Sequence, residues 1–346
     1  MKVWLDGIVF SIQPHGGISV YFRALLRHLR QLGVDHVLTL EDPTVQPVLP
    51  EDVAGSVERR AARTAERYRK ARVCQSGSPS VFHSTYYRRP ARSTMPTVVT
   101  VHDFTYERHA RGARRWTHMA QKHAAIRSAQ GIICISEATR QDLLQWVGVR
   151  PEQEVRVIPN GVAACFQPVP VDPPDSPFVL FVGLRDGYKN FALATQALAR
   201  LPRHRLLCVG GGALRETELA GLPADVRTRI QHLGIVSDLA LNTLYNQATC
   251  LLYPSSYEGF GLPVIEAMRA GCPVVSVDCK AVMEVGGHAL SVVPGNDPQG
   301  LAAAVLALHG GDRAARVTAG LSVAQHYDWQ RTHDQTLALY RDVATR

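Results

Sequence analysis

The residues best suited to chemistry lie between positions 253 and 275, in the run YPSSYEGFGLPVIEAMRAGCPVV. Glu258 lies in a glycine-containing loop after an apolar run, and Glu266 follows in a stretch with helical periodicity. Because this spacing is about two helical turns, we expect the carboxylates to hold two ends of one ligand. Glycines admit backbone N–H groups close to a ligand, and Pro263 suits the first turn of a helix. The loop therefore suits a sugar or phosphate at a helix N-terminus. The alternative from these residues alone is a tight turn made by the glycines, with Glu266 facing solvent.

Basic and imidazole groups follow two other strand-like runs. Arg185 and Lys189 lie four residues apart after the run 178–182. A guanidinium and an ammonium are the groups that bind a diphosphate, one by a bidentate grip and the other as a point charge. His102, followed by Asp103, ends another apolar run. A histidine in such a place either bonds neighbouring carbonyls or contacts a ligand, and the residues alone leave both readings open.

Two series of strands and helices must position these residues, because short β-branched runs alternate twice with amphipathic stretches. The first series has strands predicted at 2–6, 36–40, 80–84, 97–102, 131–135 and 155–158, and helices at 18–31, 56–71, 113–128 and 138–146. The second has strands at 178–182, 205–209, 230–234, 249–253, 273–277 and 289–293, and helices near 191–200, 213–220, 238–247, 263–270 and 299–308. Two such series predict an α/β fold of two doubly wound, parallel, Rossmann-like sheets.

A proline-rich segment separates the two series. Residues 167–177 contain five prolines, which remove backbone donors and keep the chain extended. We therefore expect a first domain over 1–166 and a second over 178–327. A final helix over 328–346 either caps the second domain or returns to the first. Ligands collect at the carboxyl ends of parallel strands, so two domains facing a central cleft would place the site there.

Composition excludes several classes of protein. The 346 residues are 46% hydrophobic and 20% charged, and no apolar run is long enough for a membrane-spanning helix. The opening MKVWLDGIVF predicts a buried strand rather than a signal peptide, because Asp6 interrupts a short apolar run. The seven cysteines are scattered and never spaced C-x-x-C, which argues against a disulfide framework and a zinc site. A reducing, cytoplasmic compartment is expected.

Positive charge is concentrated at the start of the chain. The net charge is +8; residues 1–170 contain 23 Lys and Arg against 14 Asp and Glu, or +9, and the rest contain 15 against 16, or −1. Two clusters stand out, Arg59 to Arg72 and Arg108 to Arg127, the second with no acidic residue. Basic helices of this kind suit an anionic membrane surface or a nucleic acid. A merely solvated face is the alternative.

The motifs recur in the order found in one known family. The sequence resembles the retaining glycosyltransferases of family four, which have the GT-B fold, because E-x7-E within EGFGLPVIEAMRAGCPVV is similar to their signature. Five further segments resemble the family: HGGISVYFRALLRHL (15–29), TVVTVHDFTYE (97–107), IICISEATRQDLL (132–144), VIPNGV (157–162) and FVGLRDGYKNF (181–191). FHSTYYRRP (82–90) resembles the branch that builds bacterial surface polysaccharides, which includes mannosyltransferases.

The resemblance implies a site for a nucleotide-diphosphate sugar, with no metal and no other cofactor. Catalytic roles are implied for His102, Arg185, Lys189 and Glu258. Donor contacts are implied for Gly16, Gly17, Asp103, Arg185, Lys189, Glu258, Gly259, Phe260, Gly261, Leu262 and Glu266. The spacing of the two glutamates does not supply the close carboxylate pair of a retaining glycosidase. Front-face displacement is therefore favoured, in which the departing phosphate takes the proton of the acceptor.

The expected activity is transfer of a hexose, with GDP-mannose slightly favoured as donor, to a glycan or polyprenyl-linked acceptor in surface polysaccharide or lipopolysaccharide synthesis. The enzyme is expected to be cytoplasmic, peripheral on the inner membrane face through its basic helices, and not to bind nucleic acid. Alternatives are another GT-B activity, a phosphorylase or sugar-nucleotide epimerase, and a non-catalytic nucleotide- or nucleic-acid-binding protein. A dehydrogenase is disfavoured because a G-x-G-x-x-G motif that begins at Gly210 would need glycine in place of Arg215. A pyridoxal enzyme is disfavoured because the second domain has only Lys189 and Lys280.

Overall fold

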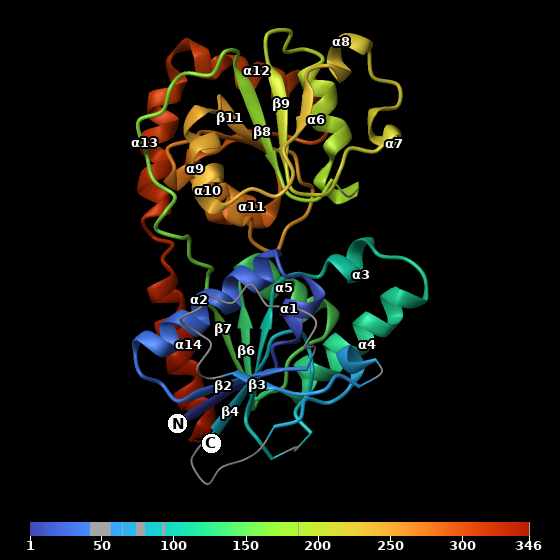
Figure 1. The fold of residues 1–346 in the computed structure, drawn as a ribbon, viewed down its shortest axis with the longest axis vertical. Coiled ribbons are helices and arrows are strands. Elements are labelled where there is room, and N and C mark those ends of the chain that lie inside the picture. Colours follow the sequence, from blue (N-terminus) through green and yellow to red (C-terminus); the bar gives the residue numbers. More distant parts are fainter. Residues whose placement is uncertain (42–56, 64, 74–79, 92–93, 186, 346) are drawn as a thin grey trace. The chain divides into compact units, whose positions relative to one another are not determined.

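The chain folds into two compact units in a computed structural model (Figure 1). The structure describes residues 1–41, 57–63, 65–73, 80–91, 94–185 and 187–345. Residues 1–161 and 329–346 form the first unit, and residues 162–328 form the second. The proline-rich segment 167–177 therefore groups with the second unit, and the last helix groups with the first.

The first unit contains a seven-stranded parallel sheet, which confirms the predicted α/β class. Its strands are β1 (Lys2–Leu5), β2 (His36–Leu40), β3 (Val57–Arg59), β4 (Ser80–Ser84), β5 (Thr97–Val101), β6 (Gly131–Cys134) and β7 (Glu154–Val157), in the order β3-β2-β1-β4-β5-β6-β7. Strand β1 pairs with both β2 and β4. The strand order reverses between β1 and β4, which is the topological switch point of a doubly wound sheet.

Helices cover both faces of this sheet (Figure 1). They are α1 (Ile8–Ile12), α2 (Gly17–Gln31), α3 (Thr105–His109), α4 (Ala113–Ser128), α5 (Glu137–Trp146) and α14 (Trp329–Ala344). Helix α2 forms because its apolar residues repeat along one stripe, from Tyr21 to Leu29, and that stripe is buried. Ser136 caps α5 by accepting a hydrogen bond from the Thr139 N–H. Helix α14 packs on α2, β4 and β6, and its Tyr340 hydroxyl is hydrogen-bonded to His83.

The helix predicted over 56–71 is wrong. The described part of that segment contains only β3 and a 3₁₀ turn, η2 (Glu66–Tyr68). The cause is a buried guanidinium. Arg88 donates to the carboxylates of Glu41 at 2.5 Å and Glu66 at 2.7 Å, and Arg63 also donates to Glu66. A carboxylate drawn inward to a buried cation fixes the segment more strongly than the intrinsic helix preference of its residues.

The second unit contains a six-stranded parallel sheet. Its strands are β8 (Phe178–Val182), β9 (Arg205–Val209), β10 (Ile230–His232), β11 (Cys250–Tyr253), β12 (Val274–Val277) and β13 (Ser291–Val293), in the order β10-β9-β8-β11-β12-β13. All of its neighbouring strands are parallel. The order reverses between β8 and β11, so the carboxyl ends of these two strands flank the switch point.

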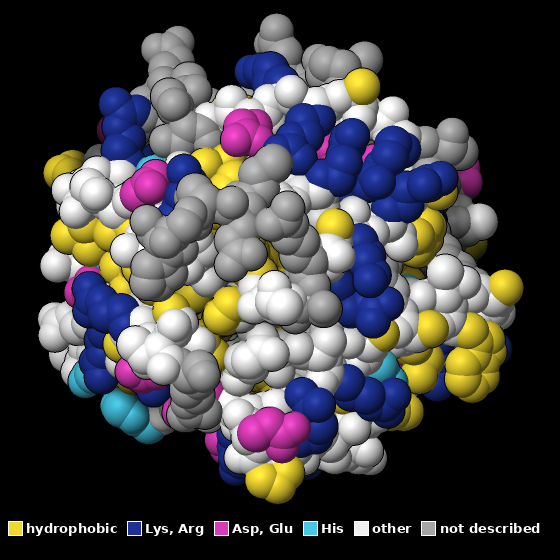
Figure 2. Space-filling view, turned by 90° about the horizontal axis from the view of Figure 1, so that it is seen from below, with side chains coloured by type: hydrophobic (Ala, Val, Ile, Leu, Met, Phe, Trp, Pro, Cys, Tyr) yellow, Lys and Arg dark blue, Asp and Glu magenta, His cyan; other side chains and the backbone are white. Residues whose placement is uncertain are grey.

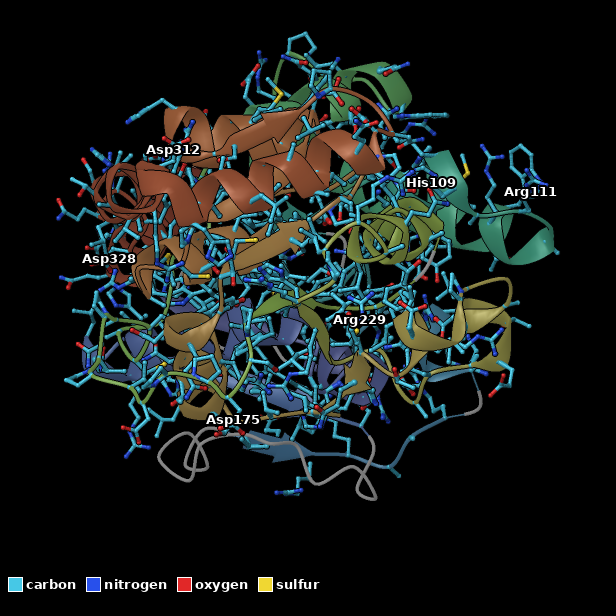
Figure 3. All side chains as sticks on the ribbon, turned by 90° about the horizontal axis from the view of Figure 1, so that it is seen from above. His109, Arg111, Asp175, Arg229, Asp312 and Asp328 are labelled. Atoms are coloured by element: carbon cyan, nitrogen blue, oxygen red, sulfur yellow. The ribbon has the colours of Figure 1, made fainter. Side chains whose placement is uncertain are left out.

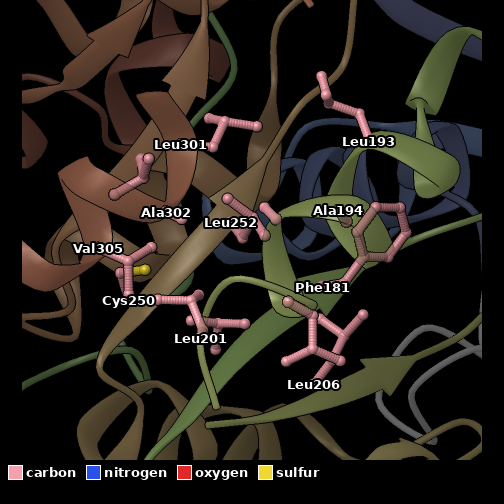
Figure 4. Close-up of a cluster of buried hydrophobic side chains, with 14 of the residues drawn as sticks. Phe181, Leu193, Ala194, Leu201, Leu206, Cys250, Leu252, Leu301, Ala302 and Val305 are labelled. Carbon is pink, nitrogen blue, oxygen red and sulfur yellow. The ribbon is translucent and has the colours of Figure 1, made fainter. Parts of the chain in front are cut away.

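The helices of the second unit are α6 (Phe191–Leu198), α7 (Glu216–Leu219), α8 (Ala224–Arg227), α9 (Asp238–Gln247), α10 (Leu262–Arg269), α11 (Lys280–Gly286), α12 (Pro298–Ala307) and α13 (Arg313–Ala324), with the short helical turns η3 (Gly187–Lys189), η4 (Gly287–Ala289) and η5 (Leu308–Asp312). Of these, α6, α8 and α12 bury an apolar core against the sheet (Figure 4). Phe181, Leu206, Leu252 and Leu301 belong to this core. Helices α8, α11 and α13 were not predicted from the sequence.

The six cysteines within the described residues are free thiols, and five are buried. Burial raises the pKa of Cys208 and Cys272 to about 12, because a thiolate there would lack hydration. Cys74 lies outside the described residues. Among the described helices, none is both long enough and apolar enough to cross a membrane.

Candidate functional site

An ion pair lies at the switch point of the second unit. The Lys189 Nζ is 2.6 Å from Glu258 Oε1 and 3.3 Å from the Tyr253 hydroxyl. Lys189 ends η3, which follows β8, while Tyr253 ends β11. Both charged side chains are 12% exposed, so they meet in a partly dehydrated place that still opens to solvent. The fold thus joins a cation and a carboxylate that are 69 residues apart in the sequence.

Backbone contacts hold the loop that carries Glu258. The Asn190 side-chain amide donates to the Pro254 carbonyl at 3.0 Å, and the Ser256 N–H donates to the Tyr188 carbonyl at 2.8 Å. The loop ends at Gly261, whose φ of 99° lies in the left-handed region that side chains rarely adopt. Helix α10 begins at the next residue, with proline in its first turn.

In the remaining part of this loop, the Phe260 side chain is buried and the backbone leads into the first turn of α10. Phe260 is buried, with its ring 5.6 Å from that of Tyr327. Its side chain is therefore part of the core, and its backbone belongs to the loop before α10. Gly259 lies in the same loop, and Leu262 is the first residue of α10. The first N–H groups of a helix lack intrahelical partners, so this edge can receive an anionic or hydroxyl-bearing ligand.

Arg185 has a different set of partners from the one expected. Its guanidinium donates to four carbonyls, those of residues 210–213, and to Glu218 Oε1 at 3.1 Å. A Cβ at Gly211 would lie 2.9 Å from Arg185 Nη1, so the loop closes over the guanidinium only with glycine there. These contacts give Arg185 a structural role that the sequence did not indicate. A contact with a diphosphate stays a prediction for this residue.

Glu266 is a partly buried carboxyl on α10. The Tyr245 hydroxyl donates to its Oε2 at 3.2 Å. Burial, together with the negative charge of Asp238, raises the pKa of Glu266 to about 7. The carboxyl therefore changes its charge near neutral pH, which suits a group that exchanges hydrogen bonds with hydroxyls.

In the first unit, His102 and Asp103 follow β5 directly. His102 is buried, and its ring meets the edge of Tyr21 with 5.3 Å between centroids. Burial and the positive charge of Lys122 lower the pKa of His102 to about 4, so the imidazole is neutral at pH 7. Within the described part of the chain, its buried Nε2 has no hydrogen-bond partner. An unpaired nitrogen of this kind is a candidate contact for a ligand.

Gly16 and Gly17 lie at the start of α2. Gly16 is the N-cap residue, and a Cβ there would lie 2.4 Å from the Gln13 side-chain oxygen. Two side chains of α2 hold the preceding turn, because Ser19 donates to the Gln13 carbonyl at 2.7 Å and Arg23 to the Pro14 carbonyl at 2.8 Å. The turn thus presents backbone at a helix N-terminus, where a phosphate can bind, and the contact of Gly16 and Gly17 with a donor stays a prediction.

Comparison with known proteins identifies the family of the chain. A model described as Glycosyltransferase Family 4 matches residues 15–164, and one described as Glycosyl transferases group 1 matches residues 176–310. The chain belongs to the family-four glycosyltransferases. The first match includes His102, and the second includes Lys189, Glu258 and Glu266. The protein is therefore an enzyme of the hexosyltransferase class.

The enzyme is similar in sequence to two mannosyltransferases. It is 27% identical to O-antigen chain mannosyltransferase B of Escherichia coli, over 81% of this chain and 79% of that one. It is also 27% identical to phosphatidyl-myo-inositol mannosyltransferase of Mycolicibacterium smegmatis, over 97% and 92% of the two chains.

Solved structures show the same GT-B fold. Sucrose-phosphate synthase of Thermosynechococcus elongatus superposes with a TM-score of 0.77 at 22% identity, over 99% of both chains. WaaG, a glycosyltransferase involved in lipopolysaccharide biosynthesis, superposes with a TM-score of 0.72 at 16% identity, over 98% of this chain and 99% of that one. At these identities the likeness establishes the fold class that the sequence predicted.

Sequence reasoning missed several residues that shape the site. Tyr253 hydrogen-bonds Lys189, and Tyr245 hydrogen-bonds Glu266. Tyr253 could have been predicted as a site residue, because it ends a predicted strand directly before the Glu258 loop. Tyr245 lies inside a predicted helix, and no sequence feature indicates its contact with Glu266. Among the described residues, no group of three or more His, Cys, Asp or Glu side chains is placed to hold a metal ion.

Proposed function

We propose that this enzyme transfers a hexose, with retention of anomeric configuration, from a nucleotide-diphosphate sugar to a glycan or polyprenyl-linked acceptor in the synthesis of a bacterial surface polysaccharide. GDP-mannose is the donor we favour. The similarity to two mannosyltransferases, one of them named for the O-antigen chain, supports this choice of sugar and pathway.

The observation that carries the proposal is the Lys189–Glu258 pair at the switch point between β8 and β11. A nucleotide-diphosphate sugar joins an anionic diphosphate to a hexose rich in hydroxyl groups. An ammonium next to a carboxylate matches that junction, since the ammonium attracts the phosphate oxygens and the carboxylate accepts hydrogen bonds from hydroxyls. Among the described residues, no feature specifically favours a phosphorylase or an epimerase of the same fold.

The chemistry we propose needs no nucleophilic carboxylate. The departing phosphate takes the acceptor proton while the acceptor oxygen attacks from the same face of the sugar. Lys189 and the N–H groups at the start of α10 stabilise the charge that grows on the leaving diphosphate. The neutral His102 imidazole offers a hydrogen bond to the donor sugar, and Glu266 accepts from the ribose hydroxyls.

A thermal-shift screen tests the donor site. Purified enzyme in EDTA is melted with GDP, UDP, dTDP or ADP, for the wild type and for Lys189→Ala. A ligand that binds the folded state raises the melting temperature, and we expect GDP to raise that of the wild type most and that of the variant much less. If a nucleotide raised the melting temperature only after Mg²⁺ was added back, that result would contradict metal-independent binding. Stabilisation by UDP alone would contradict the GDP-mannose donor.

Transfer is tested with the donor that the screen selects. The enzyme is incubated with GDP-[¹⁴C]mannose and a polyprenyl-diphosphate-linked saccharide, and the anomeric configuration of the product is read by NMR. An α-linked product from the α-configured donor is expected. Release of mannose to water without any transfer, over a panel of lipid-linked and free glycan acceptors, would contradict the transferase function.

We also propose that the basic face of the first unit contacts an anionic membrane surface. Helix α4 exposes 65% of Trp116, and the Arg115 guanidinium lies 5.4 Å from that ring. Arg111 lies exposed between α3 and α4, at the outer edge of the view in Figure 3. Figure 2 shows Lys and Arg side chains gathered on one face. Exposed basic residues of the first unit include Arg59, Arg69, Lys70, Arg89, Arg111 and Arg127.

Sedimentation with lipid vesicles tests this contact. The wild type is expected to pellet with phosphatidylglycerol vesicles and to stay in the supernatant with phosphatidylcholine vesicles. A variant with Arg59, Arg69 and Arg111 changed to Glu is expected to pellet much less. Equal pelleting of the wild type and this variant would exclude the basic face as the membrane contact.

A further inference from the structure

Lys122 does not belong to the basic surface that the sequence predicted. It lies on α4 within the Arg108 to Arg127 cluster, yet its side chain is only 1% exposed. The ammonium donates to the Asp103 carbonyl at 2.5 Å and to Glu107 Oε2 at 3.1 Å. Glu107 is buried as well, and its other carboxylate oxygen is 3.1 Å from His123 Nε2. The cation is therefore enclosed, and it is hydrogen-bonded to a backbone carbonyl and to a carboxylate close to the end of β5.

Aromatic rings close the space around this ammonium. The Phe104 ring centroid is 3.6 Å from Lys122 Nζ, and the Tyr87 centroid is 5.6 Å away. Tyr87 has a φ of 59°, a left-handed conformation that is uncommon for a bulky residue. Strained backbone persists only where its surroundings determine it, and it concentrates near functional sites. A dehydrated cation and a strained tyrosine thus meet beside the same strand end.

A buried ion pair is a weak device for stability. Removing two charges from water costs about as much as their attraction returns, and apolar side chains of similar volume are often equally stable. Stability therefore does not explain why the Lys122–Glu107 pair is buried. Its contact with the Asp103 carbonyl suggests another role, because Asp103 directly follows His102. The Thr105 N–H also donates to Asp103 Oδ1 at 2.9 Å, which fixes the same turn from its other side.

We propose that Lys122 is a positioning residue for His102. Paired with Glu107, its ammonium holds the Asp103 carbonyl and thereby fixes the strand end from which the imidazole meets the substrate. The atom oriented toward the substrate in this way is His102 Nε2, which has no hydrogen-bond partner among the described residues. This inference rests on the proposed function, because His102 is taken as a contact of the sugar that is transferred.

Two variants separate positioning from stability. Lys122→Met removes the cation from the buried Glu107 carboxylate, which among the described residues keeps only its contact with His123 Nε2, so this variant is expected to lower both the melting temperature and kcat. Lys122→Met/Glu107→Gln removes both charges and keeps an acceptor for His123, so its melting temperature should return most of the way to that of the wild type. Because the Asp103 carbonyl stays unheld, kcat for release of the sugar from the donor should remain about 10- to 100-fold low, with a nearly unchanged KM.

NMR of the His102 ring provides a readout that does not depend on activity. The titratable and charged groups near this ring are Tyr21 from α2, His83 from β4, Tyr87 after β4, Asp103 on its own loop and Lys122 from α4. The Lys122 charge opposes protonation of His102, so the His102 pKa should rise in both variants. Arg127→Met, which removes an exposed cation from the same helix, is the matched control and should leave the His102 signal unmoved.

The outcomes are distinct. Recovery of wild-type kcat in the double variant, or a His102 signal unchanged in position and pKa in both Lys122 variants, would overturn the positioning role. Low kcat with restored stability and a displaced His102 signal would establish it. Failure of the wild type itself to turn over any donor would count against the proposed function instead, and the His102 signal would still decide the question of position.

Discussion

Replacing Lys189 with methionine should weaken nucleotide binding far more than it weakens the fold. The ammonium has three N–H groups. Among the described residues it has two hydrogen-bond partners, Glu258 at 2.6 Å and the Tyr253 hydroxyl at 3.3 Å. One N–H group is thus left for a phosphate oxygen. Methionine keeps most of the length of the side chain and removes this donor.

The size of the effect follows from the burial of the pair. A hydrogen bond to a charged group contributes about 1.5–3 kcal/mol, and at 12% exposure little solvent screens this one. Its loss corresponds to a dissociation constant about 10- to 150-fold higher for the nucleoside diphosphate. The variant also leaves the Glu258 carboxylate facing the diphosphate without its cation. Lys189→Met/Glu258→Gln should therefore bind the nucleotide more tightly than Lys189→Met alone.

Isothermal titration calorimetry with the nucleotide chosen by the thermal-shift screen measures these constants. Lys280→Met is the matched control, because Lys280 is exposed at the start of α11 and is the other lysine of the second unit. Its affinity should equal that of the wild type. A Lys189→Met enzyme that binds within twofold of the wild type, or a Lys280→Met enzyme that loses as much, would refute the assignment of the phosphate contact to Lys189.

Three further results are expected from the same structure. Arg185→Met should lower the free energy of unfolding in urea by about 3–5 kcal/mol, because the carbonyls of residues 210–213 lose their guanidinium donor and Glu218 keeps only Arg215 among its described cations; a loss under about 1 kcal/mol would contradict this. Arg88→Met removes the buried cation shared by Asp6, Glu41 and Glu66 and leaves Asp6 with no other cation among its described contacts, so it should not yield folded protein at neutral pH, as judged by circular dichroism. Since the pKa of Glu266 is raised from 4.5 to about 7, the carboxylate forms as pH rises, so nucleotide affinity should increase between about pH 6 and about pH 8, and Glu266→Gln should abolish that dependence.

The raised pKa of Glu266 also fixes the sign of its effect on stability. The folded chain binds the proton more tightly than the unfolded chain, so the contribution of this group is fully present below pH 4.5. It is lost as pH rises toward 7. Nucleotide binding and this contribution to stability therefore change in opposite directions over the same range. A Glu266→Gln variant that kept the full pH dependence of nucleotide binding would place the titrating group elsewhere.

The strands could be predicted because burial on both faces leaves a clear mark on the sequence. Runs such as FVLFV at 178–182 and TVVTV at 97–101 are apolar or β-branched throughout, as a strand covered by helices on both sides requires. The helix expected over 56–71 failed for the opposite reason. Its conformation depends on Arg88, a residue distant in sequence whose burial no local pattern reveals.

The approach of Lys189 to Glu258 was implicit in the topology, because both follow strands whose carboxyl ends adjoin once the order of the sheet reverses between them. The partners of Arg185 and Lys122 were not implicit. Each lies in a segment that looks solvated, and each is turned inward by a backbone carbonyl and a carboxylate. The type of a charged residue does not reveal whether its side chain is exposed or buried, and only the folded structure distinguishes the two. The cations that the sequence showed most plainly are therefore not all available to a ligand, and Lys189, which keeps an N–H group for one, is the strongest candidate for the phosphate contact.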